Sequence, residues 1–226
     1  MSHSVGPRTV LVFGGGDNLA PQHMSRLPVP HLVIAADSGV DRARAHGVRI
    51  DLAVGDFDSV TAAGLLDAER EGTRIVRHPT AKAETDLELA LIEAMATGPE
   101  RILVVAIDGG RPDHLLANVA LLADRRFAGV TIDAFLDGGE LSVIHDKRAL
   151  TGTVGALLSL LPYGGDAEGV YASGLHYPLG GETLSAGSPR GVSNLFAASV
   201  AEVSVTRGTL LAIRPWDRAE SGALPA

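Results

Sequence analysis

Aspartate and glycine occur together at four points in the first half of the chain, each directly after a short apolar run. The four segments are residues 14–17, 36–39, 55–59 and 108–114. A single segment of this kind is typical of a turn or of a helix start, because glycine and aspartate favour both. Four of them at equivalent points of successive elements indicate one shared site.

The chemistry that such a site favours is the binding of a divalent cation. Carboxylates that gather at one place repel one another unless a cation lies between them. Oxygen ligands suit Mg²⁺, which usually keeps several waters and shares the phosphates of its substrate. Asp56 and Asp58 are two residues apart, so in extended backbone both side chains point to the same side while Phe57 points into the core. This spacing predicts a metal clamp.

Side chains that suit phosphate lie close to these acids in the sequence. Lys82 offers a compact positive charge, although a solvated surface lysine is the plainer interpretation. Arg111 precedes a predicted helix and presents a fork of donors that fits a phosphate. His114 and Asn118 are four residues apart on one face of that helix. Their position beside Arg111 and Asp113 favours a ligand role over a structural one.

Helix-start signals account for part of the same pattern. Thr85 and Glu88 match a capping box, and Asp86 between them is a candidate for the metal or the phosphates. Asp113 is a good candidate for the N-cap of the next helix. The glycine run 14–16 fits neither a dinucleotide fingerprint nor a P-loop, but backbone amides around Gly15 can approach a phosphate.

Alternating strands and helices must position these loops. Short apolar runs at residues 9–13, 31–35, 51–54, 74–76, 102–106 and 130–135 predict strands that are buried on both faces. Stretches rich in Ala, Leu and Glu at residues 84–96 and 113–126 predict helices between them. The alternation predicts an α/β domain with a mostly parallel sheet, in which ligands bind outside the carboxyl ends of the strands.

The pattern changes after about residue 148. Residues 155–161, 169–172, 198–206 and 209–213 predict short strands separated by glycine and proline, without a helical pattern. We therefore expect an α/β domain at residues 1–147 and an antiparallel all-β domain, a small sandwich or barrel, at residues 148–226. The joint between them is expected around residues 146–152.

Composition excludes several classes of function. The chain has 226 residues, no cysteine and a formal net charge of −8. The lack of cysteine excludes disulfides, thiolate zinc sites and cysteine nucleophiles, and the acidic balance without a basic run argues against nucleic acid as a partner. Because neither a signal-peptide pattern nor an apolar run near the ~18 residues of a membrane span is present, we expect a cytoplasmic protein without a membrane partner.

The ordered set of motifs resembles that of thiamine pyrophosphokinases. In the first half the motifs are residues 36–39 (ADSG), 55–59 (GDFDS), 85–88 (TDLE) and 109–114 (GGRPDH), and in the second half 159–162 (SLLP), 174–179 (GLHYPL) and 191–194 (GVSN). Each motif is weak alone, whereas the set is specific and covers nearly the whole chain. The resemblance implies an N-terminal α/β domain, a C-terminal β-sandwich and a homodimer that binds thiamine between its subunits.

The resemblance also implies roles for individual residues. It places Mg²⁺ on Asp56, Asp58 and Asp86, and it makes these three catalytic together with Arg111, Asp113 and His114, which would contact the phosphates or the acceptor hydroxyl. The residues implied at ATP are Gly15, Asp37, Ser38, Gly39, Ser59, Lys82, Thr85 and Asn118. Tyr177, Ser193 and Asn194 are implied at thiamine, with Tyr177 where some relatives have a tryptophan against the substrate ring.

The reaction that the resemblance implies is transfer of a diphosphoryl group from ATP to the hydroxyl of thiamine, with release of AMP. One position departs from the family pattern Lys-Asp-x-Thr-Asp, because Ala83 stands where the first aspartate is expected. Two alternatives are therefore kept. One is a diphosphokinase with another acceptor, such as a hydroxymethylpterin, and the other is a thiamine- or nucleotide-binding protein with impaired catalysis.

Overall fold

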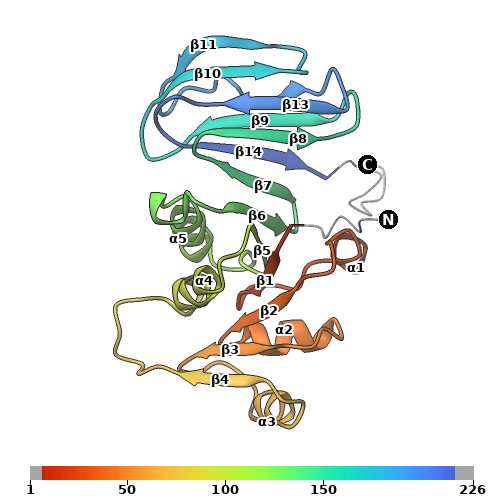
Figure 1. Cartoon of the computed structure of the whole chain (residues 1–226), viewed down its shortest axis with the longest axis vertical. Helices are drawn as coiled ribbons and strands as arrows, with labels where there is room; N and C mark the ends of the chain where they lie inside the picture. Colours follow the sequence, from red (N-terminus) through yellow and green to blue (C-terminus); the bar gives the residue numbers. More distant parts are fainter. Residues whose placement is uncertain (1–6, 217–226) are drawn as a thin grey trace. The chain divides into compact units, whose positions relative to one another are not determined.

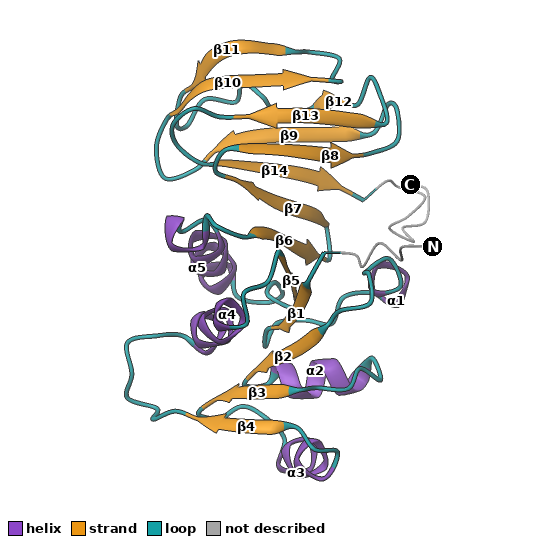
Figure 2. Cartoon of the chain, viewed as in Figure 1, coloured by secondary structure: helices purple, strands orange, loops and turns teal. Residues whose placement is uncertain are grey.

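The computed structural model describes residues 7–216, and the chain divides into two compact units. Within the described residues, unit 1 comprises 7–121 and 129–137, and unit 2 comprises 122–128 and 138–216. The region in which the joint was expected forms strand β8 (Lys147–Thr151), which belongs to unit 2. Each unit has a sheet architecture of its own (Figures 1 and 2).

Unit 1 is built on six parallel strands in the order β6-β5-β1-β2-β3-β4. Their bounds are β1 (Thr9–Phe13), β2 (Leu32–Ala36), β3 (Leu52–Gly55), β4 (Arg74–Arg77), β5 (Arg101–Val105) and β6 (Thr131–Leu136). All six predicted runs become strands, and their ends move by at most one residue. Strands β1 and β3 are buried along their whole length, which explains their uniformly apolar sequences.

Helices lie on both faces of this sheet. Their bounds are α1 (Pro21–Met24), α2 (Gly39–Ala45), α3 (Ala62–Arg70), α4 (Asp86–Ala96) and α5 (Pro112–Leu122). Figure 1 shows α2 and α3 on one side of the sheet and α4 and α5 on the other. Right-handed crossovers require this division. The chain moves across the sheet in one direction from β1 to β4, and in the opposite direction from β4 through β5 to β6.

The second predicted helix is shorter than expected. Helix α5 ends at Leu122, whereas the sequence pattern extended to residue 126. The Asp124 carboxylate accepts the Arg126 backbone N–H at 2.8 Å, and a separate 3₁₀ turn, η1 (Arg125–Phe127), begins there. Aspartate competes with the helical hydrogen bonds in this way and ends the helix.

Unit 2 is a sandwich of two antiparallel sheets, as the fold prediction stated. One layer has the strands of this unit in the order β12-β9-β14-β7, and the other layer has the order β11-β10-β13-β8. The bounds are β7 (Gly139–Ile144), β9 (Leu157–Pro162), β10 (Ala167–Ser173), β11 (Leu179–Leu184), β12 (Asn194–Leu195), β13 (Val200–Ser204) and β14 (Leu210–Pro215). Leu158 and Leu160 of one sheet share a core with Val170 and Val203 of the other.

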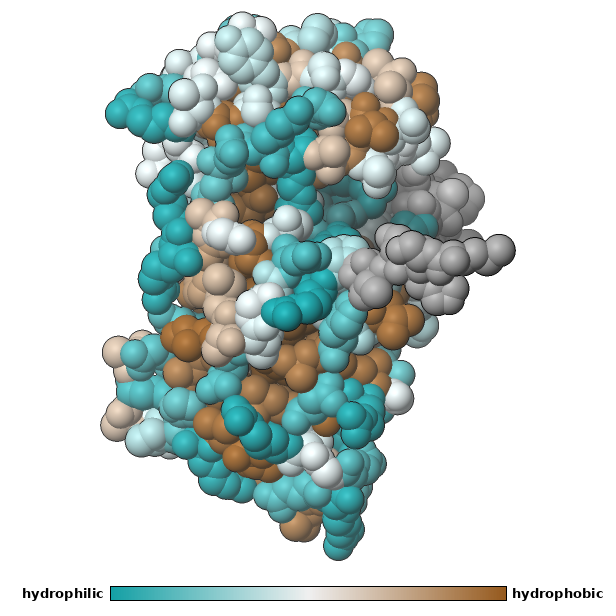
Figure 3. Space-filling model, in the orientation of Figure 1, coloured by the Kyte–Doolittle hydropathy of each residue, from teal (hydrophilic) through white to brown (hydrophobic). Residues whose placement is uncertain are grey.

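None of the helices in the described chain is both long enough and apolar enough to cross a bilayer. On the viewed face of unit 2, which occupies the upper half of Figure 3, hydrophilic and hydrophobic residues are interspersed.

Candidate active site

Three turns at the carboxyl ends of the parallel strands share an unusual backbone conformation. Asp37 after β2, Phe57 after β3 and Ala106 after β5 have φ angles of 46°, 61° and 55°. Residues other than glycine rarely adopt this left-handed conformation, which costs free energy and often marks a functional site. The strain therefore lies at the edge of the sheet where ligands of α/β proteins bind.

The turn at Phe57 differs from the extended backbone that the spacing of Asp56 and Asp58 predicted. The alternation expected for Asp56 and Asp58 assumed extended backbone, but β3 ends at Gly55 and Phe57 is left-handed. The turn nevertheless brings the two carboxylates together, and the Asp58 N–H donates to Asp56 Oδ1 at 3.3 Å. Phe57 is buried as expected, and the Arg77 guanidinium lies over its ring at 5.0 Å.

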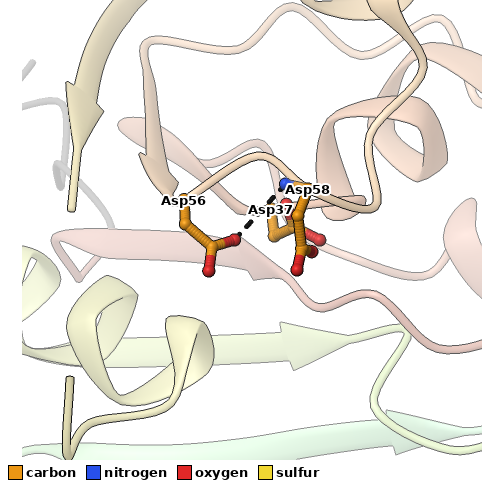
Figure 4. Close-up of side chains that lie close together, drawn as sticks. All are labelled: Asp37, Asp56 and Asp58. Atoms are coloured by element: carbon orange, nitrogen blue, oxygen red, sulfur yellow. Dashed lines mark hydrogen bonds between the residues drawn. The ribbon is translucent and has the colours of Figure 1, made fainter. Parts of the chain in front are cut away.

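Three carboxylates converge at this edge. Asp37, Asp56 and Asp58 each offer an oxygen that lies within 4.8 Å of the other two. Figure 4 shows the three side chains next to one another at the ends of neighbouring strands. The Ser59 hydroxyl donates to Asp58 Oδ1 at 2.8 Å and orients that carboxylate. A set of converging oxygens is the donor chemistry that Mg²⁺ requires.

Asp37 is the member of this group whose surroundings fit a metal ligand best. It is only 8% exposed. Burial raises the pKa of Asp37, and the carboxylates of Asp86 and Asp58 raise it further. Hydrogen bonds from the backbone of Ser38 and Ser59 lower it but do not outweigh these effects. Its Oδ1 is buried and has no hydrogen-bond partner in the described part of the chain. An orphaned, buried oxygen beside further carboxylates fits a bound divalent metal ion.

Lys82 places a positive charge beside this group. Its Nζ lies 3.0 Å from Asp86 Oδ1 and 3.5 Å from Asp56 Oδ2. Burial alone would lower the pKa of Lys82, but the two carboxylates outweigh it and raise the pKa. For Asp56, burial is likewise outweighed by the Asp58 N–H and Lys82, which lower its pKa. The predicted metal set contained Asp86, whereas the structure groups Asp37 with Asp56 and Asp58 and pairs Asp86 with Lys82.

The glycine run after β1 brings two strand-end loops into contact. The Gly16 N–H donates to the Ala106 carbonyl at 2.7 Å, and a Cβ on Gly16 would lie 2.2 Å from the Asp108 carbonyl oxygen. A Cβ on Gly15 would lie 2.4 Å from Ser38 Oγ, and one on Gly39 would lie 2.3 Å from the Phe13 carbonyl oxygen. These glycines therefore allow close approach of neighbouring loops, which places Gly15, Ser38 and Gly39 together beside Asp37.

The first turn of α4 has the expected cap. Thr85 is the N-cap, and its hydroxyl accepts the Glu88 N–H at 3.2 Å. The cap fixes the start of the helix, from which Asp86 reaches Lys82. The Thr85 hydroxyl is thereby engaged with the helix backbone.

The start of α5 differs from the expectation. The helix begins at Pro112, so Asp113 lies in its first turn and is not the N-cap. The Arg111 guanidinium binds the Asp113 carboxylate at 2.5 Å and lowers its pKa, and both side chains are exposed. His114 is exposed as well, while Asn118 Nδ2 donates to the Ile107 carbonyl at 2.9 Å and holds the loop after β5.

The predicted thiamine residues lie together in unit 2. Tyr177 is 62% exposed, and its ring meets the His176 ring edge-on with centroids 4.9 Å apart. Ser193 has a left-handed backbone with φ 60°. Asn194 is buried and hydrogen-bonds the backbone of Tyr177. An exposed aromatic face beside a tightly bonded turn can accept a flat ring.

Two polar residues beside these sites were not among the predicted site residues. His176 makes the edge-on contact with Tyr177, and its place next to Tyr177 in the motif 174–179 was the available signal. Asp108, after β5, has a pKa raised by burial and accepts the Asp137 N–H at 2.8 Å. Its position directly after an apolar strand pointed to the same sheet edge.

Comparison with known proteins identifies the family. The model "Thiamin pyrophosphokinase, catalytic domain" matches residues 27–133, and "Thiamin pyrophosphokinase, vitamin B1 binding domain" matches residues 143–210. A thiamine pyrophosphokinase of Bacillus subtilis (strain 168) is 28% identical over 215 residues, covering 92% of this chain and 98% of that protein.

Solved structures agree with this result. The crystal structure of thiamine pyrophosphokinase from Bacillus subtilis matches with a TM-score of 0.80 and 27% identity, over 92% of this chain and 99% of that one. The thiamin pyrophosphokinase of Geobacillus thermodenitrificans matches with a TM-score of 0.79 and 25% identity, over 93% of this chain and 99% of that one. Because the two family models match in order, one in each half, and the relatives align over nearly their full length, the chain belongs to the thiamine pyrophosphokinase family.

Proposed function

We propose that this protein transfers a diphosphoryl group from ATP to the hydroxyl of thiamine, giving thiamine diphosphate and AMP. The observation that carries the proposal is the convergence of Asp37, Asp56 and Asp58 at the carboxyl edge of a parallel sheet, with Lys82 beside them. Such a group suits a metal-bound triphosphate, because ligands of α/β proteins bind at this edge and Mg²⁺ shares the phosphates of its substrate. Membership in the family supports thiamine as the acceptor.

Asp37, Asp56 and Asp58 are the residues that would hold Mg²⁺. The buried, unpartnered Oδ1 of Asp37 supports this assignment. When bound, the ion neutralises charge on the phosphates of ATP. We propose that Asp86 serves the site through its ion pair with Lys82, which keeps the ammonium group beside Asp56.

The side chains of the site supply positioning and charge. Phosphoryl transfer needs little covalent help, so Lys82 and Arg111 act by holding negative oxygens in place. The hydroxyl proton of the acceptor passes to a carboxylate, and Asp86 and Asp113 are the two candidates. Each of the two carboxylates is paired with a cation, Asp86 with Lys82 and Asp113 with Arg111.

We propose that unit 2 binds the acceptor. The exposed ring of Tyr177 presents a face to the cationic thiazolium, and the Ser193 hydroxyl can hydrogen-bond the edge of a ring. We further propose a homodimer in which the acceptor bound by one subunit meets ATP bound by the other. Sedimentation velocity at assay concentration tests this, and an active monomer would refute the shared site.

The experiment that tests the function measures AMP release. Purified protein with ATP, Mg²⁺ and thiamine should form AMP, and omission of thiamine should abolish it. Hydroxymethylpterin in place of thiamine is the control for the acceptor. AMP formed only with the pterin would make the protein a diphosphokinase of another acceptor, and thiamine binding without AMP would make it a binding protein.

A further inference from the structure

The side-chain amide of Asn194 is engaged almost entirely with backbone groups. Asn194 is only 4% exposed. Its Oδ1 accepts the Tyr177 N–H at 3.0 Å, and its Nδ2 donates to the Tyr177 carbonyl at 2.7 Å. The same Oδ1 also accepts the Leu195 N–H at 2.9 Å. Little of this amide remains for a ligand, so direct contact with an acceptor is a poor explanation of its presence.

The amide of Asn194 takes the place of a missing strand partner. Before Tyr177 the chain pairs through its backbone, because the His176 N–H donates to the Leu195 carbonyl at 2.9 Å and Leu175 bridges Phe196. Asn194 itself pairs through its backbone with Leu158 of β9. The Asn194 side chain then bonds both backbone groups of Tyr177.

The chain around Asn194 is itself held firmly. Ser193 adopts a left-handed conformation with φ 60°, and its N–H donates to Ser159 Oγ at 3.1 Å. The Leu160 N–H donates to the Gly191 carbonyl at 2.8 Å. The turn 191–193 is thus fixed to β9. The hydrogen bonds of the Asn194 side chain connect the backbone of Tyr177, whose ring is exposed, to this fixed turn.

We infer that Asn194 is a positioning residue for the acceptor, acting through Tyr177. It fixes the backbone from which the Tyr177 ring projects, while Tyr177 makes the contact. This inference rests on the proposed function in one respect, namely that Tyr177 contacts thiamine. It assigns Asn194 a different role from the direct thiamine contact that the family resemblance implied.

A double-variant experiment tests the inference by steady-state kinetics. Asn194→Ala should raise the KM for thiamine about tenfold, the size expected when one or two neutral hydrogen bonds are lost, and leave the KM for ATP nearly unchanged. The variant Tyr177→Ala/Asn194→Ala should be no worse than Tyr177→Ala alone, because both changes remove the same contact. Effects that multiply in the double variant would mean that Asn194 touches the acceptor directly and would overturn the inference.

Thr209→Val is the matched control for general damage to unit 2. The Thr209 hydroxyl is buried and lies 3.1 Å from His145 Nδ1, so the change also removes a polar contact from this unit. Thr209→Val should lower the unfolding temperature and leave both KM values unchanged. If Asn194→Ala lowers the unfolding temperature to a similar extent and changes the two KM values equally or not at all, its role is only structural and the inference fails.

A second measurement separates this inference from the proposed function. Fluorotyrosine can be incorporated at the three tyrosines of the chain, and Tyr177→Phe identifies the ¹⁹F resonance of Tyr177. Asn194→Ala should narrow this resonance and shift it toward that of free fluorotyrosine, whether or not thiamine is the substrate. An unchanged Tyr177 resonance would overturn the inference, whereas absence of AMP formation by the wild-type protein would overturn the proposed function.

Discussion

Replacing Asp37 with asparagine should make the protein more stable and much less active. The substitution keeps the size of the side chain, and asparagine tolerates the left-handed φ of 46° as aspartate does. It removes the negative charge of a carboxyl group whose pKa is raised by burial and by the carboxylates of Asp86 and Asp58. It also places a hydrogen-bond donor near those two carboxylates.

The size of the stability effect follows from the orphaned oxygen of Asp37. A buried polar group without a partner costs about 1–3 kcal/mol, so relief of part of this cost should stabilise the metal-free protein by about 1 kcal/mol. For a chain of this length the melting temperature should rise by roughly 2–4 °C. Turnover should fall about 10²-fold, because charge stabilisation at the metal site weakens.

The pH dependence has a defined sign. The raised pKa of Asp37 means that its ionised form costs folding stability above that pKa. As the pH falls through the raised value, the folded protein takes up a proton at Asp37 before the unfolded chain does. The cost then disappears in the wild type, and the advantage of Asp37→Asn should shrink.

The assay is thermal unfolding by circular dichroism in chelator at pH 7 and pH 5, together with AMP release at saturating Mg²⁺. Asp133→Asn is a matched control, because Asp133 is fully buried in the same unit but paired with Arg101 at 2.6 Å. Loss of that charge should destabilise the protein. A lower melting temperature for Asp37→Asn at pH 7, or nearly full activity, would show that Asp37 is neither a destabilising charge nor a metal ligand.

Four further predictions concern the metal site, the acceptor site and a partly buried histidine. Asp56→Asn should reduce turnover by about 10²-fold or more, and AMP release that survives excess chelator would contradict the metal dependence behind this. Ala83→Asp should raise activity or reduce the Mg²⁺ needed for half-maximal rate, whereas a large loss would mean that the site is built around Ala83. Tyr177→Ala should raise the KM for thiamine and not that for ATP in steady-state assays, and equal damage to both would point to misfolding. Burial lowers the pKa of His145 below its ordinary 6.5. Stability should therefore fall as the pH drops below 6.5, because the unfolded chain binds the proton more readily than the folded protein does. The urea midpoint should fall less between pH 7.5 and pH 5.5 in His145→Gln than in the wild type.

The strands of unit 1 were predictable because burial on both faces leaves only apolar residues in them. Strands β1 and β3 are buried throughout, and their runs stand out from the neighbouring sequence. Helix α2 (Gly39–Ala45) and strand β8 were not predicted. The helix is short, begins with glycine and has no side-chain cap, while β8 has charged residues and alternating exposure at the surface. Such elements depend on tertiary packing more than on their own sequence.

The convergence of Asp37, Asp56 and Asp58 was also predictable, because their loops follow adjacent parallel strands. The pairing of Lys82 with Asp86 was not, since it depends on how the loop before α4 returns to the sheet. The hydrogen bonds between the Asn194 side chain and the backbone of Tyr177 could not be predicted either, because they also join segments that are distant in the sequence. Motifs indicate which residues gather, whereas side-chain partners between distant segments depend on the final packing.

The most direct test of diphosphoryl transfer follows the β-phosphate of ATP. ATP labelled at the β-phosphorus should be incubated with thiamine, Mg²⁺ and the protein, and the products separated. Direct transfer should give one AMP for each thiamine diphosphate, with the label in the phosphate bonded to the thiamine oxygen. Formation of ADP and thiamine monophosphate, or release of unlabelled product, would contradict direct transfer of a diphosphoryl group.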